Sequence, residues 1–371
     1  MFLQTLNLSN FRNFSKAQVE FEELTLFIGD NAQGKSNILE AIYFLATTKS
    51  YKADKDSNLI SSQQEVCRVE GELKENSMDL TQLEIVMQAA GTGSIVNTGG
   101  TGNVDEPSFL KRVKVNGVSK RVVDYIGNLV VIFFSPEDMN LIIGSPSTRR
   151  WHIDLTLAQV DRVYKKAISV YSEAITSRNR VLKRIREEVA RAGELEYWTK
   201  QILENGLIIQ QKRTEFFNNL NLQIPKLGLE AGFLKDLTLI YKESLISQER
   251  LETYQSREIA AATTLIGPHR DDFAMFAGER NLFLFGSRGE IRTAILDLKL
   301  AELEYVSQIK GSRAVLLLDD IFSELDEKHR EYVVSLVSGQ QTIITAIEKG
   351  EVPQSLLKKA KIITVSLGEL V

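Results

Sequence analysis

The sequence predicts an α/β fold of mixed sheets flanked by helices, built from both ends of the chain and interrupted by a mostly α-helical insert. Three observations support this prediction. The chain opens with alternating apolar and polar residues, its middle has helical periodicity with little Gly or Pro, and a fully apolar run stands at 314–318. We therefore expect an α/β domain from 1–135 and 262–371, and a helical domain from 136–261.

Composition limits the class of protein. The 371 residues are 43% hydrophobic and 25% charged, which is enough to bury a large core and too apolar for a disordered chain. The single Cys67 excludes a disulfide framework and a thiolate metal cluster, and three histidines argue against a multi-histidine centre. No run reaches the roughly 18 apolar residues of a membrane span, and the first residues show no signal peptide. We therefore expect a cytoplasmic protein with no membrane partner.

The opening segments predict strands followed by a helix. Leu6 and Leu8 alternate with polar residues, a turn is expected at 10–14, and two short strand-like runs fill 19–28. Over 37–47 the apolar residues recur at helical spacing. The loop between the last strand and this helix is a natural place for a binding site.

That loop has the spacing of a phosphate-binding loop. Gly29, Gly34 and the Lys35-Ser36 pair fit G-x-x-x-x-G-K-[ST] between a predicted strand and a predicted helix. Glycines let backbone N–H groups surround an anion, and the helix N-terminus adds a positive dipole end. Lys35 can reach the β- and γ-phosphates, and the Ser36 hydroxyl can bind Mg²⁺. The residues expected to cradle the nucleotide are Gly29, Asp30, Asn31, Ala32, Gln33, Gly34, Lys35, Ser36 and Asn37.

The middle of the chain predicts a long helical hairpin. Apolar residues recur every three or four positions from Leu157 to Ala174, Gly193 interrupts the pattern, and the pattern then resumes. We expect two long antiparallel helices that end at Pro225. By contrast, the stretch 89–102 is rich in Gly, Thr and Ser and predicts a loop.

An acidic pair follows the apolar run of the carboxyl-terminal part. Asp319 and Asp320 stand where a central parallel strand ends, which is where open α/β sheets bind ligands. We expect Asp319 to hold Mg²⁺ through water and Asp320 to polarise the attacking water. Taken alone, the pair could equally be a solvated turn.

A second anion site is predicted upstream. Ser287 stands at a plausible N-cap of a helix over 289–306, and exposed Ser and Gly groups at a helix start can bind an anion. In isolation this segment could be only a capped helix. Lys35, Asp320 and Ser287 are the residues expected to take part in catalysis.

Four elements therefore stand in one order: a phosphate loop, a Ser-x-Gly helix start, an Asp-Asp strand end and a Ser-x-Leu-Asp run. This order resembles ABC-type ATPase heads and, more closely, the RecF family of bacterial DNA repair proteins. The likeness spans nearly the whole chain. It also includes Leu8-Ser9-Asn10-Phe11-Arg12-Asn13-Phe14, Phe134-Ser135-Pro136-Glu137-Asp138, Gly144-Ser145-Pro146-Ser147-Thr148-Arg149-Arg150 and Gly267-Pro268-His269-Arg270-Asp271-Asp272.

The resemblance implies an ATP- and Mg²⁺-dependent homodimer. Two ATP molecules would lie between two copies, each held by one phosphate loop and by Ser287, Arg288 and Gly289 of the other copy. Arg12 would contact the nucleotide and Asp326 would lie at the dimer seam. The family further implies weak, DNA-stimulated hydrolysis, action at single-strand gaps, a RecR-type mediator and help in loading the recombinase.

Several positions depart from related heads. Arg288 replaces a usual glutamine, and Glu290-Ile291 replaces a common Gln-Gln pair. Asp320 stands where transporters have glutamate, and Thr345 stands where many transporter heads have a switch histidine. The shorter Asp320 suggests slow hydrolysis. Arg288 could strengthen the contact with the opposing ATP or weaken packing at the seam.

A basic helical stretch is the candidate DNA contact. Between Arg149 and Arg191 eleven residues are basic and five acidic, although the whole chain carries a net charge of -4. Clustered Lys and Arg bind phosphates without sequence preference. A solvated helix surface with ion pairs is the alternative. The residues chosen for DNA binding are Arg178, Arg180, Lys183 and Arg184.

Two other functions remain open at this point. An ATPase subunit of an ABC transporter would need a glutamine loop and a switch histidine, which Thr345 and the helical hairpin argue against. A non-hydrolysing module would use ATP only to gate dimerisation, which the intact Lys35, Asp319 and Asp320 argue against.

Overall fold

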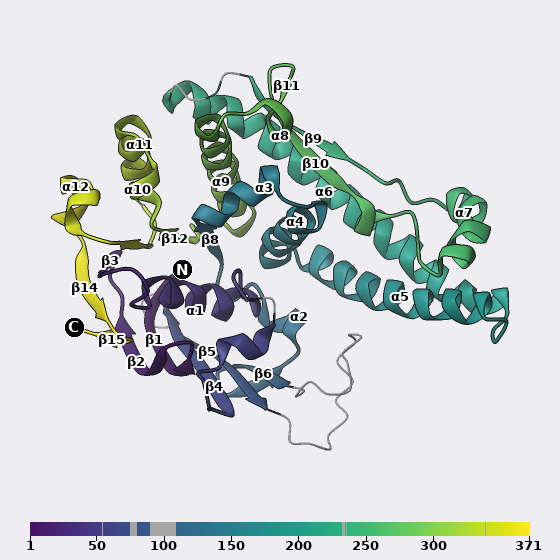
Figure 1. Ribbon diagram of the computed structural model, residues 1–371, viewed down its shortest axis with the longest axis horizontal. Coiled ribbons are helices and arrows are strands. Elements are labelled where there is room, and N and C mark those ends of the chain that lie inside the picture. Colours follow the sequence, from purple (N-terminus) through teal and green to yellow (C-terminus); the bar gives the residue numbers. More distant parts are fainter. Residues whose placement is uncertain (54, 75–79, 90–108, 232–233, 235, 338) are drawn as a thin grey trace. The chain divides into compact units, whose positions relative to one another are not determined.

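The computed structural model describes residues 1–53, 55–74, 80–89, 109–231, 234, 236–337 and 339–371. They form two compact units, one of 1–138 with 306–371 and one of 139–305 (Figure 1). Nearly all of the Gly-rich loop predicted at 89–102 lies outside the described residues. None of the described helices has both the length and the apolar character needed to cross a membrane.

An antiparallel sheet opens the first unit. The described part of this sheet has the strand order β2-β1-β4-β5-β6-β7. Its strands are β1 (Phe2–Phe11), β2 (Phe14–Glu20), β4 (Val66–Lys74), β5 (Leu80–Ala89), β6 (Phe109–Val115) and β7 (Val118–Lys120). Phe11 pairs with Phe14 across the turn predicted at 10–14, and Arg12 has a left-handed φ of 53° there. The predicted turn is confirmed.

A mostly parallel sheet forms the other half of the first unit. Its order is β15-β14-β3-β13-β12-β8, and all its described pairings except β14 with β15 are parallel. The strands are β3 (Leu24–Ile28), β8 (Val131–Phe134), β12 (Val315–Asp319), β13 (Thr342–Ala346), β14 (Lys361–Ser366) and β15 (Glu369–Leu370). Every residue of β12 and β13 is buried, as their apolar runs require. The carboxyl ends of β3, β12 and β13 therefore meet at one edge.

Helix α1 (Lys35–Thr47) confirms the helix predicted over 37–47. Its buried face includes Ile38, Leu39 and Ile42, all at 0% exposure. The other helices and turns assigned wholly to this unit are η1 (Asp56–Leu59), α2 (Val122–Tyr125), α10 (Ile321–Glu324), α11 (Glu327–Val337), η5 (Lys349–Glu351) and α12 (Gln354–Leu357).

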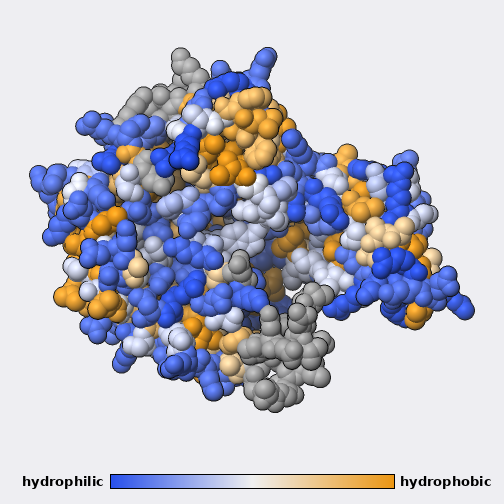
Figure 2. Space-filling view, viewed as in Figure 1, coloured by the Kyte–Doolittle hydropathy of each residue, from blue (hydrophilic) through white to orange (hydrophobic). Residues whose placement is uncertain are grey.

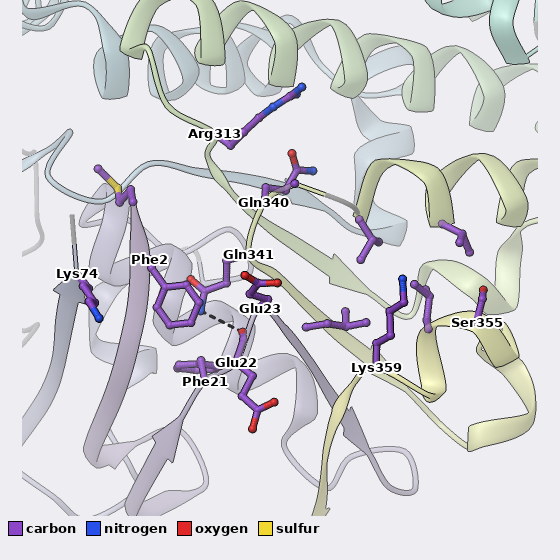
Figure 3. Close-up of a pocket in the computed structure, with 16 residues that line it drawn as sticks. Phe2, Phe21, Glu22, Glu23, Lys74, Arg313, Gln340, Gln341, Ser355 and Lys359 are labelled. Carbon is purple, nitrogen blue, oxygen red and sulfur yellow. Dashed lines mark hydrogen bonds between the residues drawn. The ribbon is translucent and has the colours of Figure 1, made fainter. Parts of the chain in front are cut away.

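Gln341 joins the two sheets of this unit at the amino end of β13. Its side-chain amide donates to the Leu3 carbonyl at 2.7 Å, and its oxygen accepts from the Leu3 N–H at 2.7 Å. Gln341 also lines a cavity of about 1190 Å³, together with Phe2, Phe21 and Lys359 among others (Figure 3). The cavity lies at the strand ends opposite to those that carry the predicted phosphate loop.

The second unit is mainly helical. Its elements are α3 (Asn140–Ile143), α4 (Pro146–Val160), α5 (Arg162–Arg186), η3 (Ala192–Leu195), α6 (Glu196–Ala231), β9 (Leu237–Lys242), α7 (Gln248–Ala261), η4 (Pro268–Arg270), β10 (Asp272–Ala277), β11 (Arg280–Asn281) and α8 (Leu282–Phe285). Turn η2 (Pro136–Met139) spans the first boundary, and helix α9 (Arg288–Lys310) begins in this unit and ends in the other.

Helices α5 and α6 confirm the predicted antiparallel hairpin. Arg178 bonds to Thr199 near the turn, while Tyr164 bonds to Arg213 far from it, so the two helices run in opposite directions. Val181, Leu182 and Leu195 are buried where the chain reverses.

Two details of the hairpin prediction were wrong. The first helical stretch is divided into α4 and α5 because the Asp161 carboxylate caps α5, accepting from Val163 and Tyr164 N–H groups at 2.8 and 2.9 Å. Helix α6 continues past Pro225. Proline inside a helix removes one backbone donor and crowds the carbonyl four residues before it. The buried Ile224 and the Asn221–Leu239 hydrogen bonds anchor this segment against that cost.

The compact units and the predicted domains agree near residue 136 but differ at the second boundary. Residues 262–305 belong to the unit of the insert. The reason is a backbone pairing: β10 pairs along its whole length with β9, from Leu237↔Ala277 to Lys242↔Asp272. A strand paired in this way cannot separate from the insert without breaking its ladder.

A buried ionic network holds the Gly-Pro-His-Arg-Asp-Asp segment in the second unit. Arg213 is 1% exposed and bonds to Asp271 at 2.9 Å and Asp154 at 2.7 Å. Asp271 is also 1% exposed and accepts from Gln210 and from the Ser244 N–H at 3.0 and 2.7 Å. Each buried charge therefore has a partner, which buried charges require.

We predict that Arg213→Met destabilises the second unit by about 3–5 kcal/mol, because it leaves the Asp271 carboxylate buried without its cation. Lys212→Met is the matched control on the same helix. Its partly exposed ion pairs with Asp161 and Glu215 should contribute about 0–1 kcal/mol. Urea unfolding followed by tryptophan fluorescence measures both, since Trp151 and Trp198 lie in this unit. Equal losses for the two variants would contradict the prediction.

Candidate functional site

The phosphate loop connects β3 to α1 and is fixed by a neighbouring asparagine. Gly34 has a φ of 115°, and a Cβ there would lie 2.6 Å from the Asn13 side chain. Asn13 donates to the Gln33 carbonyl at 2.9 Å and accepts from the Asn37 amide at 2.8 Å. The left-handed φ of Gly34 favours glycine, and the Asn13 hydrogen bonds hold the loop in a curved shape.

Lys35 folds back over the loop that it follows. Its ammonium donates to the carbonyl oxygens of Gly29 and Asp30 at 2.5 and 2.8 Å. Burial lowers the pKa of Lys35, and the carboxylates of Asp320 and Asp319 oppose this shift. The ammonium thus stands inside the curl of the loop, where carbonyl oxygens of the loop itself accept its hydrogen bonds.

Asp319 is the centre of a hydrogen-bonded cluster at the end of β12. It is 3% exposed and accepts from the hydroxyls of Ser36 at 2.8 Å, Thr345 at 2.7 Å and Tyr51 at 3.3 Å. Burial, followed by the Asp319 charge, raises the pKa of Tyr51 well above its ordinary value, so this phenol remains a donor. The Ser36 hydroxyl and the Asp319 carboxylate are hard oxygen ligands of the kind that Mg²⁺ prefers, so the residues fit this ion.

Asp320 has an unusual backbone and an unpaired oxygen. Its φ is 51°, and its N–H donates to the Thr345 hydroxyl at 3.0 Å. Its Oδ1 is buried and has no hydrogen-bond partner among the described residues. Burial raises the pKa of Asp320, which makes it a stronger proton acceptor once ionised. A buried carboxylate oxygen without a partner indicates that a water or ligand belongs beside it.

These groups line a cavity of about 250 Å³. The lining contains Asn31, Ala32, Gly34, Lys35, Ser36, Asn37, Lys52, Asp319, Asp320, Thr345 and Ile347. The predicted Gly29, Asp30 and Gln33 belong to the loop but not to this lining. The sequence reasoning missed Lys52, because a lysine in a turn beyond the helix has no motif around it.

Arg12 makes its contacts away from the cavity. Its guanidinium forms a two-pronged ion pair with the fully buried Glu40, at 2.6 and 2.8 Å, and a bond to the Asn58 carbonyl at 2.9 Å. It is not among the residues that line the cavity. Its predicted contact with the nucleotide stays a prediction.

The predicted Ser287 cap is present in the second unit. The Ser287 hydroxyl accepts from the Glu290 N–H at 3.3 Å, and the Glu290 carboxylate accepts from the Ser287 N–H at 2.9 Å. This is a capping box, whose Ser-x-x-Glu spacing the sequence displays. The bond from Arg280, together with Ser287, lowers the pKa of Glu290 to about 2. Arg288 and Gly289 form the first turn of α9 behind this cap.

Asp326 stands at the start of α11. Its Oδ1 accepts from the backbone N–H and from the Nδ1 of His329 at 2.9 and 2.6 Å. The side chain is 67% exposed. A role at a dimer seam stays a prediction.

The candidate DNA residues separate into two groups. Arg180, Lys183 and Arg184 are exposed on one face of α5. They lie in the carboxyl-terminal half of this helix, and the surface at that end of the helix is mostly hydrophilic (Figure 1, Figure 2). The prediction for Arg178 was wrong. Arg178 is 1% exposed and bonds to Glu258 at 2.7 Å and Thr264 at 2.8 Å, so it holds α5 to the rest of the unit.

Comparisons with known proteins agree with this architecture. The family model "RecF/RecN/SMC N terminal domain" matches residues 2–367. DNA replication and repair protein RecF of Bacillus thuringiensis (strain Al Hakam) and that of Bacillus cereus (strain B4264) are each 35% identical. Each alignment covers 99% of this chain and 98% of the relative.

Solved structures show the same relationship. The recombination mediator protein RecF with ATP, of the RecFOR pathway, has a TM-score of 0.87 and 29% identity, covering 100% of this chain and 97% of that chain. A second RecF structure, with ATPrS, has a TM-score of 0.85 at the same identity and coverage. The Smc head domain of Pyrococcus furiosus, at 17% identity and a TM-score of 0.50, shares the fold over 100% of this chain and 96% of that chain.

The predicted fold class is thereby confirmed as an ABC-type ATPase head with an inserted helical region. The family model spans nearly the whole chain, and the curated relatives exceed 30% identity over their full length. The chain belongs to the RecF family.

Proposed function

We propose that this protein is an ATP-dependent DNA-binding protein of DNA replication and recombinational repair, with a weak ATPase activity. The observation that carries the proposal is the cavity in which Lys35, Ser36 and Asp319 stand beside the unpartnered Oδ1 of Asp320. This set matches the residue types that phosphoryl transfer from a nucleoside triphosphate requires.

Each residue has a distinct task in this proposal. The N–H groups of the loop and Lys35 bind the β- and γ-phosphates, and Ser36 with Asp319 would hold Mg²⁺. The ion supplies charge neutralisation at the phosphates when bound. Asp320 orients and polarises the attacking water through its free oxygen, and its raised pKa favours proton acceptance.

A homodimer would complete the site. By family likeness, Ser287, Arg288 and Gly289 of one copy contact the ATP held by the other copy. Asp326 lies at the seam, and Arg12 contacts the nucleotide. The capping box supports this role, because it fixes the start of α9 where backbone N–H groups and Arg288 can meet an anion. ATP would join two copies and hydrolysis would separate them.

DNA would bind along α5. Arg180, Lys183 and Arg184 are spaced by three and four positions and share an exposed face. Two such faces in a dimer could clamp DNA at a single-strand gap. The RecF relatives support a further role with a RecR-type mediator in loading the recombinase. The alternative is a module that binds ATP without hydrolysing it. A measurement of phosphate release distinguishes this module from the proposed ATPase.

Sedimentation tests the dimer directly. We expect the wild-type chain to change from monomer to dimer with ATP and Mg²⁺, and to retain DNA only in that state. Lys35→Ala should abolish both effects, because it removes the cation of the phosphate loop. A wild-type chain that stays monomeric with saturating nucleotide and DNA would contradict the proposal.

Asp320→Asn separates hydrolysis from binding. The amide keeps the size of the carboxylate but cannot accept a proton, so phosphate release should fall by about 10²–10⁴-fold while ATP-dependent dimerisation persists. Phosphate release with DNA present is the measurement. No release from the wild type would select the non-hydrolysing module.

Neutralising the exposed basic face should weaken DNA binding alone. The triple variant Arg180→Ala, Lys183→Ala and Arg184→Ala removes up to three phosphate contacts, so DNA affinity and its salt dependence should both fall. ATP affinity should not change. Fluorescence anisotropy at two salt concentrations measures the DNA affinity and its salt dependence. A loss of ATP binding would contradict the assignment of these residues to DNA binding.

A further inference from the structure

The turn between β14 and β15 contacts the phosphate loop at Gln33. The Leu367 N–H donates to the Gln33 side-chain oxygen at 2.6 Å, and the Gly368 N–H donates to the Gln33 carbonyl at 3.2 Å. The Asn13 amide, from the turn between β1 and β2, donates to the same carbonyl at 2.9 Å. Both the side chain and the backbone of Gln33 are therefore held by the β14–β15 turn.

The backbone of this turn is unusual for the residues that it contains. Leu367 and Gly368 have φ values of 49° and 80°, the positive pair that a type I′ hairpin turn requires and that Asn-Gly normally supplies. Leucine rarely adopts this conformation. The Leu367 side chain is 84% exposed, so its packing does not compensate the strain. The conformation instead aims the Leu367 N–H at Gln33, and strain of this kind is typical of positions that serve a function.

The same hairpin also meets the first glycine of the phosphate loop. A Cβ at Gly29 would lie 2.3 Å from the carbonyl oxygen of Val365, so β14 passes directly against the start of the loop. A Cβ at Gly368 would lie 2.5 Å from the carbonyl oxygen of Asn13. The hairpin thus contacts the loop on both sides of its curve, at Gly29 and at Gln33.

The hairpin is itself firmly held. β14 pairs in parallel with β3, the strand that leads into the phosphate loop, and Val365 is 1% exposed. Two backbone hydrogen bonds of 2.9 Å join Thr364 to Val371, and β15 lies beside β2 (Figure 1). The turn therefore gives the phosphate loop a rigid support.

These contacts act on the nucleotide cavity from outside it. Gln33, Leu367 and Gly368 are not among the residues that line the cavity. Gln33 directly precedes Gly34 and Lys35, and the N–H groups of such a loop surround the α- and β-phosphates of a nucleotide. A change in the position of Gln33 would therefore change the direction of the N–H groups that these phosphates meet.

We propose that the β14–β15 turn is a positioning element of the nucleotide site, in which Leu367 and Gly368 act through Gln33 to fix the curve of the phosphate loop. This inference rests on the proposed function, since it requires a nucleotide in the loop. The α- and β-phosphates are common to ATP and ADP, so release of the turn weakens the binding of both.

The test compares two glycines with similar backbones. Gly117 follows Asn116 in the turn between β6 and β7 of the same unit, has a φ of 75° and has nothing within 4 Å of an added Cβ. Gly368→Ala should weaken binding of a fluorescent ATP analogue and of its ADP counterpart about tenfold each, as for one or two lost hydrogen bonds. Gly117→Ala is the matched control, with the same backbone strain, and should bind both nucleotides as the wild type does.

Three further variants examine the hydrogen bonds themselves. Gln33→Met removes only the side-chain acceptor and should weaken both nucleotides about threefold, which remains informative if Gly368→Ala is unstable. Leu367→Pro lacks the N–H and cannot adopt a positive φ, so it should weaken both nucleotides as well. Leu367→Asn restores the N–H with the residue that this turn prefers, and should rescue the binding that the proline variant loses.

The outcomes separate this inference from the proposed function. Unchanged binding in Gly368→Ala, or equal weakening in Gly117→Ala, would overturn the positioning role of the turn. Failure of Leu367→Asn to rescue binding would show that the leucine side chain carries the effect, and would overturn the role of its N–H. A wild type that binds neither nucleotide would instead overturn the proposed function.

Discussion

The first unit depends on the placement of one buried carboxylate. Asp319 ends a fully buried strand, where an unpaired charge would be strongly unfavourable. The hydroxyls that pair with it come from α1, from the turn after α1 and from the end of β13. Ser36 and Asp319 are 283 positions apart, so this cluster joins the two ends of the chain. The hydrogen bonds that satisfy this buried carboxylate therefore hold the unit together and also place the polar groups of its cavity.

The local parts of this arrangement are predictable because their signals are local. The phosphate loop, α1 and the β12 end are each specified by a short run of residue types whose backbone geometry has few alternatives. The Ser287 cap is similar, and its Ser-x-x-Glu spacing even contains the capping box. What such runs lack is information about partners distant in sequence. Lys52 and the Arg12–Glu40 pair became visible only with the fold, because their contacts span separate elements.

Arg178 shows how a charge can mislead. The buried positions of α5 include Tyr171, Ala174, Arg178, Val181 and Leu182, which follow a regular helical stripe. Periodicity alone would have placed Arg178 inside, but its charge suggested the surface. Glu258, which comes from α7, resolves the conflict by pairing with it at 0% exposure. Burial of a cation is thus decided by a residue 80 positions away, which no local window can contain. The boundary at 262 failed for the same reason, since the pairing of β9 with β10 is also nonlocal.

The cavity is already internally bonded, and this shapes how it can respond to a ligand. Lys35 holds two carbonyls of its own loop, Ser36 holds Asp319, and Lys52 lies near the same carboxylate. A triphosphate with a divalent cation would exchange these contacts for new ones more than add to them. The net binding free energy gained per hydrogen bond is then modest, because each new bond replaces an equivalent one. In the proposed function, binding would replace one complete set of contacts with another, and that exchange would give the loop and the turn after α1 two distinct states. Coupling dimer formation to the second state requires only that the partner surface fit it better than the first.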